Sequence, residues 1–493
     1  MKFFLMVTIF SFFANGSVFK ILNDPIDALS ARYAITKNAK QKIYSSKFIF
    51  HADDTGLASL ALLRAQKRLM KNPDVRLIFD GGGPGFGTDV PGEVLLHLEE
   101  EGIQVKFFNN LMDKKNVLKN LYNGKYFAQR MHDKLFIVDG EYLLTGGRNV
   151  EGTYFAVAEK GTYVDRDVLV TGQAVKDAEK HFLNYWNSPV STKASFAIMT
   201  RKYCWDKYKI SNLGKCKNKM RKMGRYLLDQ QEARIEALMN QFNISSKYIS
   251  KIEDEVLKQN DVKVEFIGDS LKEDNLSYKS VLGPEMLKLV NSATKSIVIE
   301  SPYLIPTPNF SKAVDALLKR GVDIKILTNS MSSIDGIQVF AGYLKYRSSL
   351  MKLGTPKNRL QVYEYYGAHL GSTHGKTIHS KSMSIDDEIA IIGSYNLDKL
   401  SEYHNSEVAV VAYSPARAIE LRKYIEERRE FTYKLGDDGI PCPPNTCSRD
   451  ESGDWVGGQL AHPFATISKI KDVSKWLKRL NNPIWGPIIE NHL

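Results

Sequence analysis

The chain has few cysteines, and they fit no metal-binding template. Its 493 residues contain four of them, with no Cys-x-x-Cys pair and no neighbouring pair of histidines. The usual zinc spacings are therefore absent, and we expect neither a metal nor another cofactor. Four cysteines allow three connectivities, of which the local disulfides Cys204–Cys216 and Cys442–Cys447 are the plausible pairs in an exported protein.

Long apolar segments are also missing, except at the start of the chain. Lys2 precedes an apolar run from Phe3 to Ala14, and Gly16 follows shortly after. The run is shorter than the ~20 residues of a membrane-spanning helix, so we interpret residues 1–16 as a secretory signal peptide rather than a retained anchor. The sequence thus predicts an exported protein, periplasmic or secreted, with peripheral attachment to a membrane as a further option.

Proline and glycine are not in excess, and acidic residues are outnumbered by basic ones. Hydrophobic residues make up 43% and charged residues 25%, which is typical of a globular protein of two domains at this length. The net charge of +12 favours polyanionic partners, either a membrane surface or nucleic acid, and does not choose between them. A basic surface that only keeps the protein soluble is the alternative. The composition carries no signal for the oligomeric state.

One pattern that is present, His-x-Lys-x-x-x-x-Asp, occurs twice, 247 positions apart, and each copy ends in a Gly-x-x-Asn tail. The copies are His132, Lys134, Asp139 with Gly146–Asn149, and His379, Lys381, Asp386 with Gly393–Asn396. Two copies in register argue for a duplicated half rather than a chance match.

Around these motifs, short β-rich runs alternate with helical patterns. The first half is expected to contain strand 47–50, helix 57–70, strand 75–79, helix 93–100 and strand 104–108. The second half is expected to contain strand 296–300, helix 311–319, strand 323–327, helix 337–351 and strand 360–363. This alternation predicts an α/β fold with two similar halves, each a mixed, mainly parallel sheet flanked by helices.

The remaining segments complete the expected domain organisation: signal peptide 1–16, first half 17–199, basic helical linker or insertion 200–258, second half 259–430 and C-terminal tail 431–493. The insertion has a dense positive cluster of Lys215, Lys217, Lys219, Arg221, Lys222 and Arg225. A linker or lid is its expected role, and a stripe that binds lipid or nucleic acid is the alternative. In the tail, residues 468–493 predict a basic amphipathic helix that either lies on an anionic membrane or docks onto the protein itself.

The residue types of the motif suit chemistry on a phosphate diester. Two residues separated by a single residue on a strand point to the same face, so the histidine and lysine of each copy can contact one bound group. Positive charges and amide donors for the phosphate oxygens would come from Lys134, Lys381, Asn149 and Asn396, with Gly147 and Ser394 shaping the tails around the substrate. His132 and His379 would supply a nucleophile and a general acid and base, because imidazole titrates near neutral pH.

Four acidic residues complete the candidate site. Glu407 follows the second motif and Asp165 follows the first, so each could accept a ring N–H and fix the tautomer of a histidine. Asp139 and Asp386 stand at turns, which favours bonding to local backbone. We include these two among the candidate catalytic residues as the least direct members.

The paired motifs resemble those of the phospholipase D superfamily. The sequence in and around the motifs most resembles that of the bacterial cardiolipin synthases. The segments that carry this resemblance are Arg130–Lys134, Gly146–Asn149, Ser301–Tyr303, Thr328–Ser330 and Gly393–Asp398. The resemblance implies two phospholipase D-like halves with the active site at their interface, a phosphohistidine on His132, and His379 as acid and base. The export signal and the long insertion depart from the usual membrane-bound synthase.

The implied activity is phosphatidyl transfer from a glycerophospholipid, either to an alcohol as in cardiolipin synthesis or to water, which gives phosphatidic acid. A phospholipid substrate and a membrane surface are then the expected partners. A secreted, metal-independent nuclease using the same chemistry is the alternative. A catalytically silent lipid- or nucleic-acid-binding protein is disfavoured, because neither motif lacks its histidine or lysine.

Overall fold

The contacts of the chain define two compact units that do not follow sequence order. The computed structural model describes residues 17–82, 88–110, 129–158, 162–194, 201–242, 244, 262–271, 278–353, 359–367, 377–439, 441–442, 448–449, 455–456 and 467–482. Unit 1 comprises Met1–Val157, Asp167–Lys279 and Asn405–Val410, and unit 2 comprises Ala158–Arg166, Ser280–His404 and Val411–Leu493. The signal peptide expected at residues 1–16 and Cys447 of the second expected disulfide lie outside the described residues.

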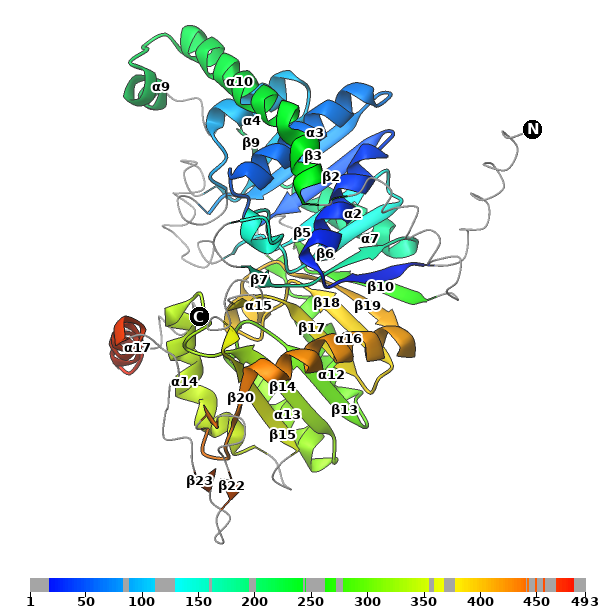
Figure 1. Cartoon of the computed structure of the whole chain (residues 1–493), viewed down its shortest axis with the longest axis vertical. Helices are drawn as coiled ribbons and strands as arrows, with labels where there is room; N and C mark the ends of the chain where they lie inside the picture. The colour runs from blue at the N-terminus through cyan, green and yellow to red at the C-terminus, as the bar shows by residue number, and fades with distance from the viewer. Residues whose placement is uncertain are drawn as a thin grey trace, which may run out of the picture. The chain divides into compact units, whose positions relative to one another are not determined.

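The sheet of unit 1 is mixed, with its parallel strands side by side (Figure 1). Its strands are, in spatial order, β1 (Phe19–Leu22), β8 (Asp167–Val170), β6 (Tyr142–Gly146), β5 (Lys134–Val138), β2 (Lys42–Lys47), β3 (Asp74–Asp80), β4 (Gln104–Phe108) and β9 (Ser191–Lys193). Strands β2, β3 and β4 are parallel, whereas β5 runs antiparallel to β2 and forms a hairpin with β6. The motif thus sits on the hairpin beside the parallel strands.

The second sheet repeats this order. It contains in succession β19 (Val408–Tyr413), β18 (Ile389–Gly393), β17 (Lys381–Ile385), β13 (Ser296–Glu300), β14 (Asp323–Asn329), β15 (Leu360–Tyr365), β20 (Thr432–Leu435) and β21 (Pro441–Cys442). Strands β13, β14 and β15 are parallel, and the β17–β18 hairpin lies next to β13. Seven strands of one sheet therefore correspond one to one with seven of the other. The corresponding orders are β8-β6-β5-β2-β3-β4-β9 and β19-β18-β17-β13-β14-β15-β20. The predicted α/β fold of two similar halves is confirmed.

Most predicted elements lie within a few residues of the observed ones, namely α3 (Asp54–Leu69), α4 (Gly92–Glu100), α13 (Pro308–Lys319) and α14 (Ile337–Met351). The strand expected at 47–50 is wrong, because β2 covers Lys42–Lys47 instead. Four of its six residues are serine or lysine, yet Ser45, Ser46 and Lys47 are buried. A polar strand enclosed by neighbours gives no hydrophobic periodicity, so the apolar residues that follow it misled the prediction.

The aspartate of each motif fastens the hairpin turn to the neighbouring parallel strand. Asp139 and Asp386 both have a positive φ of 54°, a conformation that aspartate tolerates better than most residues. The Asp139 carboxylate accepts hydrogen bonds from the backbone N–H groups of residues 40, 41 and 42, at the start of β2. Asp386 accepts the equivalent bonds from residues 294, 295 and 296, before and at the start of β13. Although burial raises the pKa of Asp386, these backbone donors hold it below its ordinary value.

The insertion is helical, as predicted, and a disulfide closes it. Helices α9 (Arg201–Tyr208) and α10 (Leu213–Gln241) are joined by the predicted bond between Cys204 and Cys216, which is thereby confirmed. The long helix α10 packs along α3 and α4 of unit 1 (Figure 1). It thus belongs to the first unit rather than to a separate body.

The tail helix docks onto the protein. Helix α17 (Ile467–Leu480) packs beside α14 in unit 2 and buries Val473 and Leu480 of its apolar stripe. Of the two alternatives for this helix, docking is therefore the one observed. Within the described ranges, no helix combines the length and the apolar character that crossing a bilayer requires.

Helix α10 offers a test of its packing. A Cβ atom at Gly224 would collide with the carbonyl oxygen of Glu93 in α4. Gly224→Ala should therefore lower the free energy of unfolding by about 1–3 kcal/mol, because overpacking outweighs a gain of about 1 kcal/mol in helix propensity. Gly214→Ala, at an exposed position of the same helix, is the matched control and should not destabilise. Urea unfolding measures both, and equal effects would contradict this packing.

Candidate active site

In unit 1, the first motif histidine is bonded to a carboxylate. His132 precedes β5 rather than lying on it, so the expectation of histidine and lysine on one strand is wrong; the strand begins at Lys134. The His132 Nδ1 atom lies 2.8 Å from Glu407 Oε2, and both residues are buried. Glu407 belongs to the short segment Asn405–Val410 that unit 1 receives from beyond the second motif.

A set of backbone and side-chain bonds fixes this segment. Met131 and Ser406 form a parallel bridge, in which the His132 N–H donates to Ser406 O at 2.9 Å. The Asp133 carboxylate accepts from the Ser406 hydroxyl at 2.9 Å and lies 2.7 Å from His181 Nε2, on α7 (Gln173–Trp186). Asp133, inside the motif, therefore connects the histidine segment to both the Glu407 segment and α7.

Unit 2 repeats the arrangement with different residues. The His379 Nδ1 atom lies 2.6 Å from Asp165 Oδ2, and again both residues are buried. The strand before the histidine, β16 (Thr377–Ile378), pairs in parallel with β7 (Tyr163–Val164), and the His379 N–H donates to Val164 O at 2.7 Å. In both units, therefore, a short parallel pairing delivers a carboxylate to Nδ1 of the motif histidine.

These carboxylates come from the opposite halves of the sequence. Asp165 follows the first motif and serves the second, whereas Glu407 follows the second motif and serves the first. The structure thus assigns both predicted carboxylates to histidines. The sequence did not reveal which carboxylate pairs with which histidine.

Each motif lysine lies beside the histidine of its own copy. Lys134 Nζ donates to His132 O at 2.8 Å. Lys381 Nζ donates to His379 O and lies 3.1 Å from His379 Nδ1. Both ammonium groups are buried next to the carboxylate-bound imidazole. A positive charge is thus fixed near each ring, as stabilisation of a phosphate requires.

The asparagines of the two tails are buried and only partly satisfied. Asn149 Nδ2 donates to the Tyr154 hydroxyl at 2.9 Å, while the Oδ1 atoms of Asn149 and Asn396 have no hydrogen-bond partner in the described part of the chain. A buried amide with an unmatched polar atom is uncommon away from functional sites. Gly147 and Ser394 are buried in the same tails.

Asp139 and Asp386 have a different environment from the other candidates. Their carboxylates accept hydrogen bonds from the backbone N–H groups before and at the start of the neighbouring strand. These bonds give both aspartates a structural role. This bonding matches the expectation that they are the least direct members of the set.

Sequence reasoning missed several buried charged residues near the motifs. Arg166 donates its N–H to Asp165 Oδ1 at 2.7 Å and its guanidinium to Glu300 at 2.8 Å, so it holds the carboxylate of the second pair. Lys47 is the cross-strand neighbour of Lys134, and its burial lowers its pKa well below the ordinary value. A polar residue within a β-run was the only sequence signal for Lys47, and Arg166 gave none beyond its place next to Asp165.

The surroundings of His379 set its protonation. Burial lowers the pKa of the ring below 6.5, the Lys381 ammonium lowers it further, and the Asp165 carboxylate opposes both. The lowered pKa favours the neutral form of the ring. When Nδ1 donates to the carboxylate, the lone pair resides on Nε2, the atom that can attack phosphorus or take a proton.

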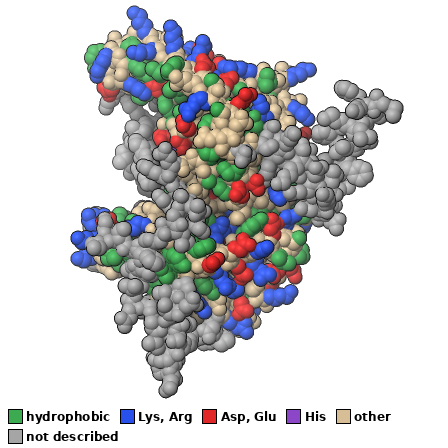
Figure 2. Space-filling model, viewed as in Figure 1, with side chains coloured by type: hydrophobic (Ala, Val, Ile, Leu, Met, Phe, Trp, Pro, Cys, Tyr) green, Lys and Arg blue, Asp and Glu red, His purple; other side chains and the backbone are tan. Residues whose placement is uncertain are grey.

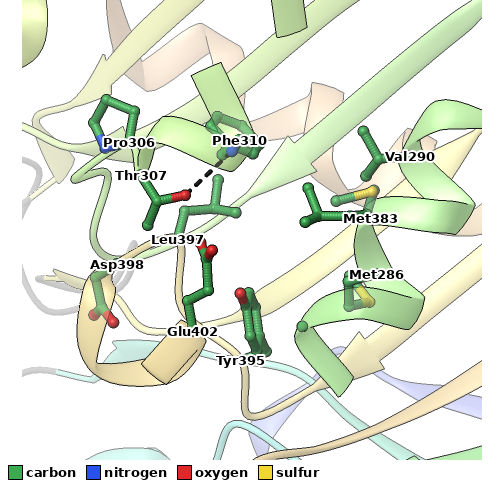
Figure 3. Close-up of a pocket in the computed structure, with 12 residues that line it drawn as sticks. Met286, Val290, Pro306, Thr307, Phe310, Met383, Tyr395, Leu397, Asp398 and Glu402 are labelled. Atoms are coloured by element: carbon green, nitrogen blue, oxygen red, sulfur yellow. Dashed lines mark hydrogen bonds between the residues drawn. The ribbon is translucent and has the colours of Figure 1, made fainter. Parts of the chain in front are cut away.

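An apolar pocket adjoins the second motif within unit 2 (Figure 3). Its wall includes Met286, Val290, Phe310, Met383 and Leu397, with the polar groups of Asp398 and Glu402 also in the lining. Met383 lies two residues beyond Lys381 on β17, so the two side chains share a face of the sheet. An apolar surface therefore begins one step along the strand from the motif lysine.

Comparisons with known proteins agree with this geometry. The model of a family described as cardiolipin synthase, PLD-like domain, matches residues 34–186 and 286–429. Cardiolipin synthase C of Escherichia coli is 27% identical over 431 residues, 84% of this chain and 85% of that protein. Cardiolipin synthase 1 of Staphylococcus aureus is 24% identical over 417 residues, 84% of this chain and 68% of that protein.

A solved structure shares the fold over nearly the whole chain. Phosphatidylserine synthase of Haemophilus influenzae aligns with a TM-score of 0.62 and 14% identity, covering 96% of this chain and 95% of that one. At this identity the likeness concerns the fold alone.

The charges around His379 can be tested one at a time. Lys381→Met should raise the pKa of the His379 ring, because a nearby positive charge is removed, and Asp165→Asn should lower it, because a negative charge and a hydrogen bond are lost. Nuclear magnetic resonance of ring-labelled histidine across pH 4 to 9 measures both changes. Shifts of the same sign in the two variants would contradict this electrostatic description.

Proposed function

Because the chain belongs to the family described as cardiolipin synthase, PLD-like domain, we propose that it is a phospholipase D-type phosphatidyltransferase. The observation that carries this proposal is the occurrence, in each unit, of a buried histidine held by a carboxylate at Nδ1 and flanked by a lysine. Such an imidazole presents Nε2 in the tautomer that attack or proton transfer needs. The two copies together supply the two histidines that a double displacement at phosphorus uses.

In the proposed first step, His132 Nε2 attacks the phosphorus of a glycerophospholipid diester. The P–N bond forms as the P–O bond to the headgroup alcohol breaks, and His379 gives its proton to the departing oxygen. The product is a phosphatidyl-histidine and a free alcohol. His132 is assigned as the nucleophile by the resemblance of the first motif, and the reverse assignment is an outcome of the test below.

In the second step, the neutral His379 ring takes the proton of an incoming hydroxyl, whose oxygen attacks phosphorus and releases His132. A lowered pKa keeps the ring in the neutral form that can accept this proton, and the negative charge of a bound phosphodiester would raise that pKa for the first step. Lys134 and Lys381 would balance the charge on the phosphate oxygens, with Asn149 and Asn396 as amide donors.

The finer proposal concerns the substrates. With phosphatidylglycerol as both donor and acceptor the product is cardiolipin, and with water it is phosphatidic acid. The match to a family model described as cardiolipin synthase supports a phospholipid over a nucleic acid as the substrate. We further propose that the protein acts outside the cytosol, a location supported by the Cys204–Cys216 disulfide.

Substrate class can be decided with two substrates and no added metal. Phosphatidylglycerol vesicles incubated with the protein and a chelator should yield cardiolipin or phosphatidic acid, whereas plasmid DNA should remain intact. Thin-layer chromatography and gel electrophoresis read the two products. The His132→Ala, His379→Ala double variant is the blank, and cleavage of DNA without lipid turnover would reject the lipid proposal.

The roles of the histidines can be separated with an activated substrate. A phosphatidyl ester of p-nitrophenol needs no protonation of its leaving group, so His379→Ala should still form the phosphoenzyme but break it down about 10²- to 10⁴-fold more slowly. His132→Ala should form none. Rapid quench with labelled lipid measures both steps, and His51→Ala controls for loss of an unrelated histidine. Phosphoenzyme in His132→Ala but not in His379→Ala would reverse the assignment.

A further inference from the structure

One helical hairpin has a net positive charge that is large relative to that of the whole chain. Residues 201–226, which include α9 and the first half of α10, contain ten lysines and arginines against a single acidic residue, Asp206. Their net charge of +9 is three quarters of the +12 carried by all 493 residues. This hairpin also falls between the two ranges that the family model matches, so the proposed chemistry leaves it unexplained.

The hairpin is held rigidly on unit 1. The Cys204–Cys216 disulfide lies in a small core with Leu96 and Met220. Farther along α10, buried Arg64 of α3 donates to Asp229 at 2.5 Å and to Glu232 at 2.5 Å, which anchors the helix to the body of the unit. Both halves of α10 are therefore fixed to unit 1, the basic half through the core around the disulfide and the C-terminal half through Arg64.

The basic half also exposes large apolar side chains. Trp205, Met223 and Tyr226 are 55%, 42% and 56% exposed, and they lie among the exposed residues Lys215, Lys219, Lys222 and Arg225. Basic side chains along α9 and α10, with hydrophobic ones between them, are visible at the top of the molecule in Figure 2. Three of the seven exposed large hydrophobic residues in the described part of the chain lie in this one hairpin, and a concentration of such residues marks an interaction surface.

We propose that the surface of α9 and the first half of α10 docks the protein on an anionic phospholipid membrane. Lysine and arginine are attracted to the negative headgroups, while tryptophan and tyrosine prefer the interfacial layer because their rings are apolar and their polar edges remain hydrated. Both kinds of side chain are exposed on α9 and the first half of α10. The proposal rests on the proposed function only for the choice of phospholipid as the anionic partner.

The tail helix α17 is the natural comparison. It too is basic, with exposed Lys471, Lys475 and Lys478, but Val473 and Leu480 are buried beside α14, Trp476 is partly buried, and Ile470, 38% exposed, is its one large hydrophobic residue of the exposed class. Helix α17 therefore carries positive charge without exposed aromatic residues. If docking needs both, the membrane should bind the α9–α10 surface and not α17.

Vesicle flotation with the full-length protein tests the docking surface. Wild type should float with vesicles of phosphatidylglycerol and phosphatidylcholine, less so at high salt, and not with phosphatidylcholine alone. The variant Lys215→Glu, Lys219→Glu, Lys222→Glu should reduce binding about 100-fold, since each basic residue near the surface contributes strongly. Trp205→Ser with Tyr226→Ser should weaken binding even at low salt, which a purely electrostatic surface would not show.

The matched control is Lys471→Glu, Lys475→Glu, Lys478→Glu on α17, which changes the net charge equally and should leave flotation within about twofold of wild type. Equal losses in the two triple variants would overturn the proposal, as would loss of binding to a labelled DNA duplex with flotation unchanged. Turnover of a soluble short-chain phosphatidylglycerol is measured in parallel. Flotation without turnover counts against the proposed function, and turnover without hairpin-dependent flotation counts against this inference alone.

Discussion

The carboxylate bonded to Nδ1 of each motif histidine is the constraint on which the rest of the structure depends. A buried carboxylate is costly unless it is paired. The Glu407 carboxylate pairs with the His132 imidazole and the Asn405 side-chain amide, and the Asp165 carboxylate pairs with the His379 imidazole and the Arg166 backbone N–H. The short parallel pairings at Met131 and at β16 place these carboxylates next to the histidines. The hairpins, the aspartates at their turns and the lysines then fix the histidines from the other side.

Duplication preserved this constraint while much around it diverged. Asp133 links the first histidine segment to Ser406 and to His181, whereas the corresponding Ser380 donates to Glu300. Buried Lys47 stands opposite Lys134, and β13 has no lysine. The two copies therefore share the geometry of the histidine and its carboxylate but differ in the charged residues nearby.

Much of this could be predicted from the sequence, and the exceptions have a common physical cause. The hairpins, most helices and the repeated sheet follow from local periodicity and from the paired motifs. The polar strand β2 was misplaced because its burial comes from neighbours in space, which a local pattern does not record. The partners of the histidines were equally hidden, since Glu407 is 275 residues from His132 and Asp165 is 214 from His379. The charge of the insertion was visible, but its fixed support on α3 and α4 was not.

The exchange of carboxylates has a consequence for biosynthesis. A chain growing from its N-terminus contains the complete first motif long before Glu407 is made, and it contains Asp165 long before there is a His379 to receive it. Until all but about the last sixth of these 493 residues has been made, the first histidine lacks the carboxylate that fixes its tautomer. A fragment that ends before residue 407 therefore cannot hold both motif histidines in their carboxylate-bound form.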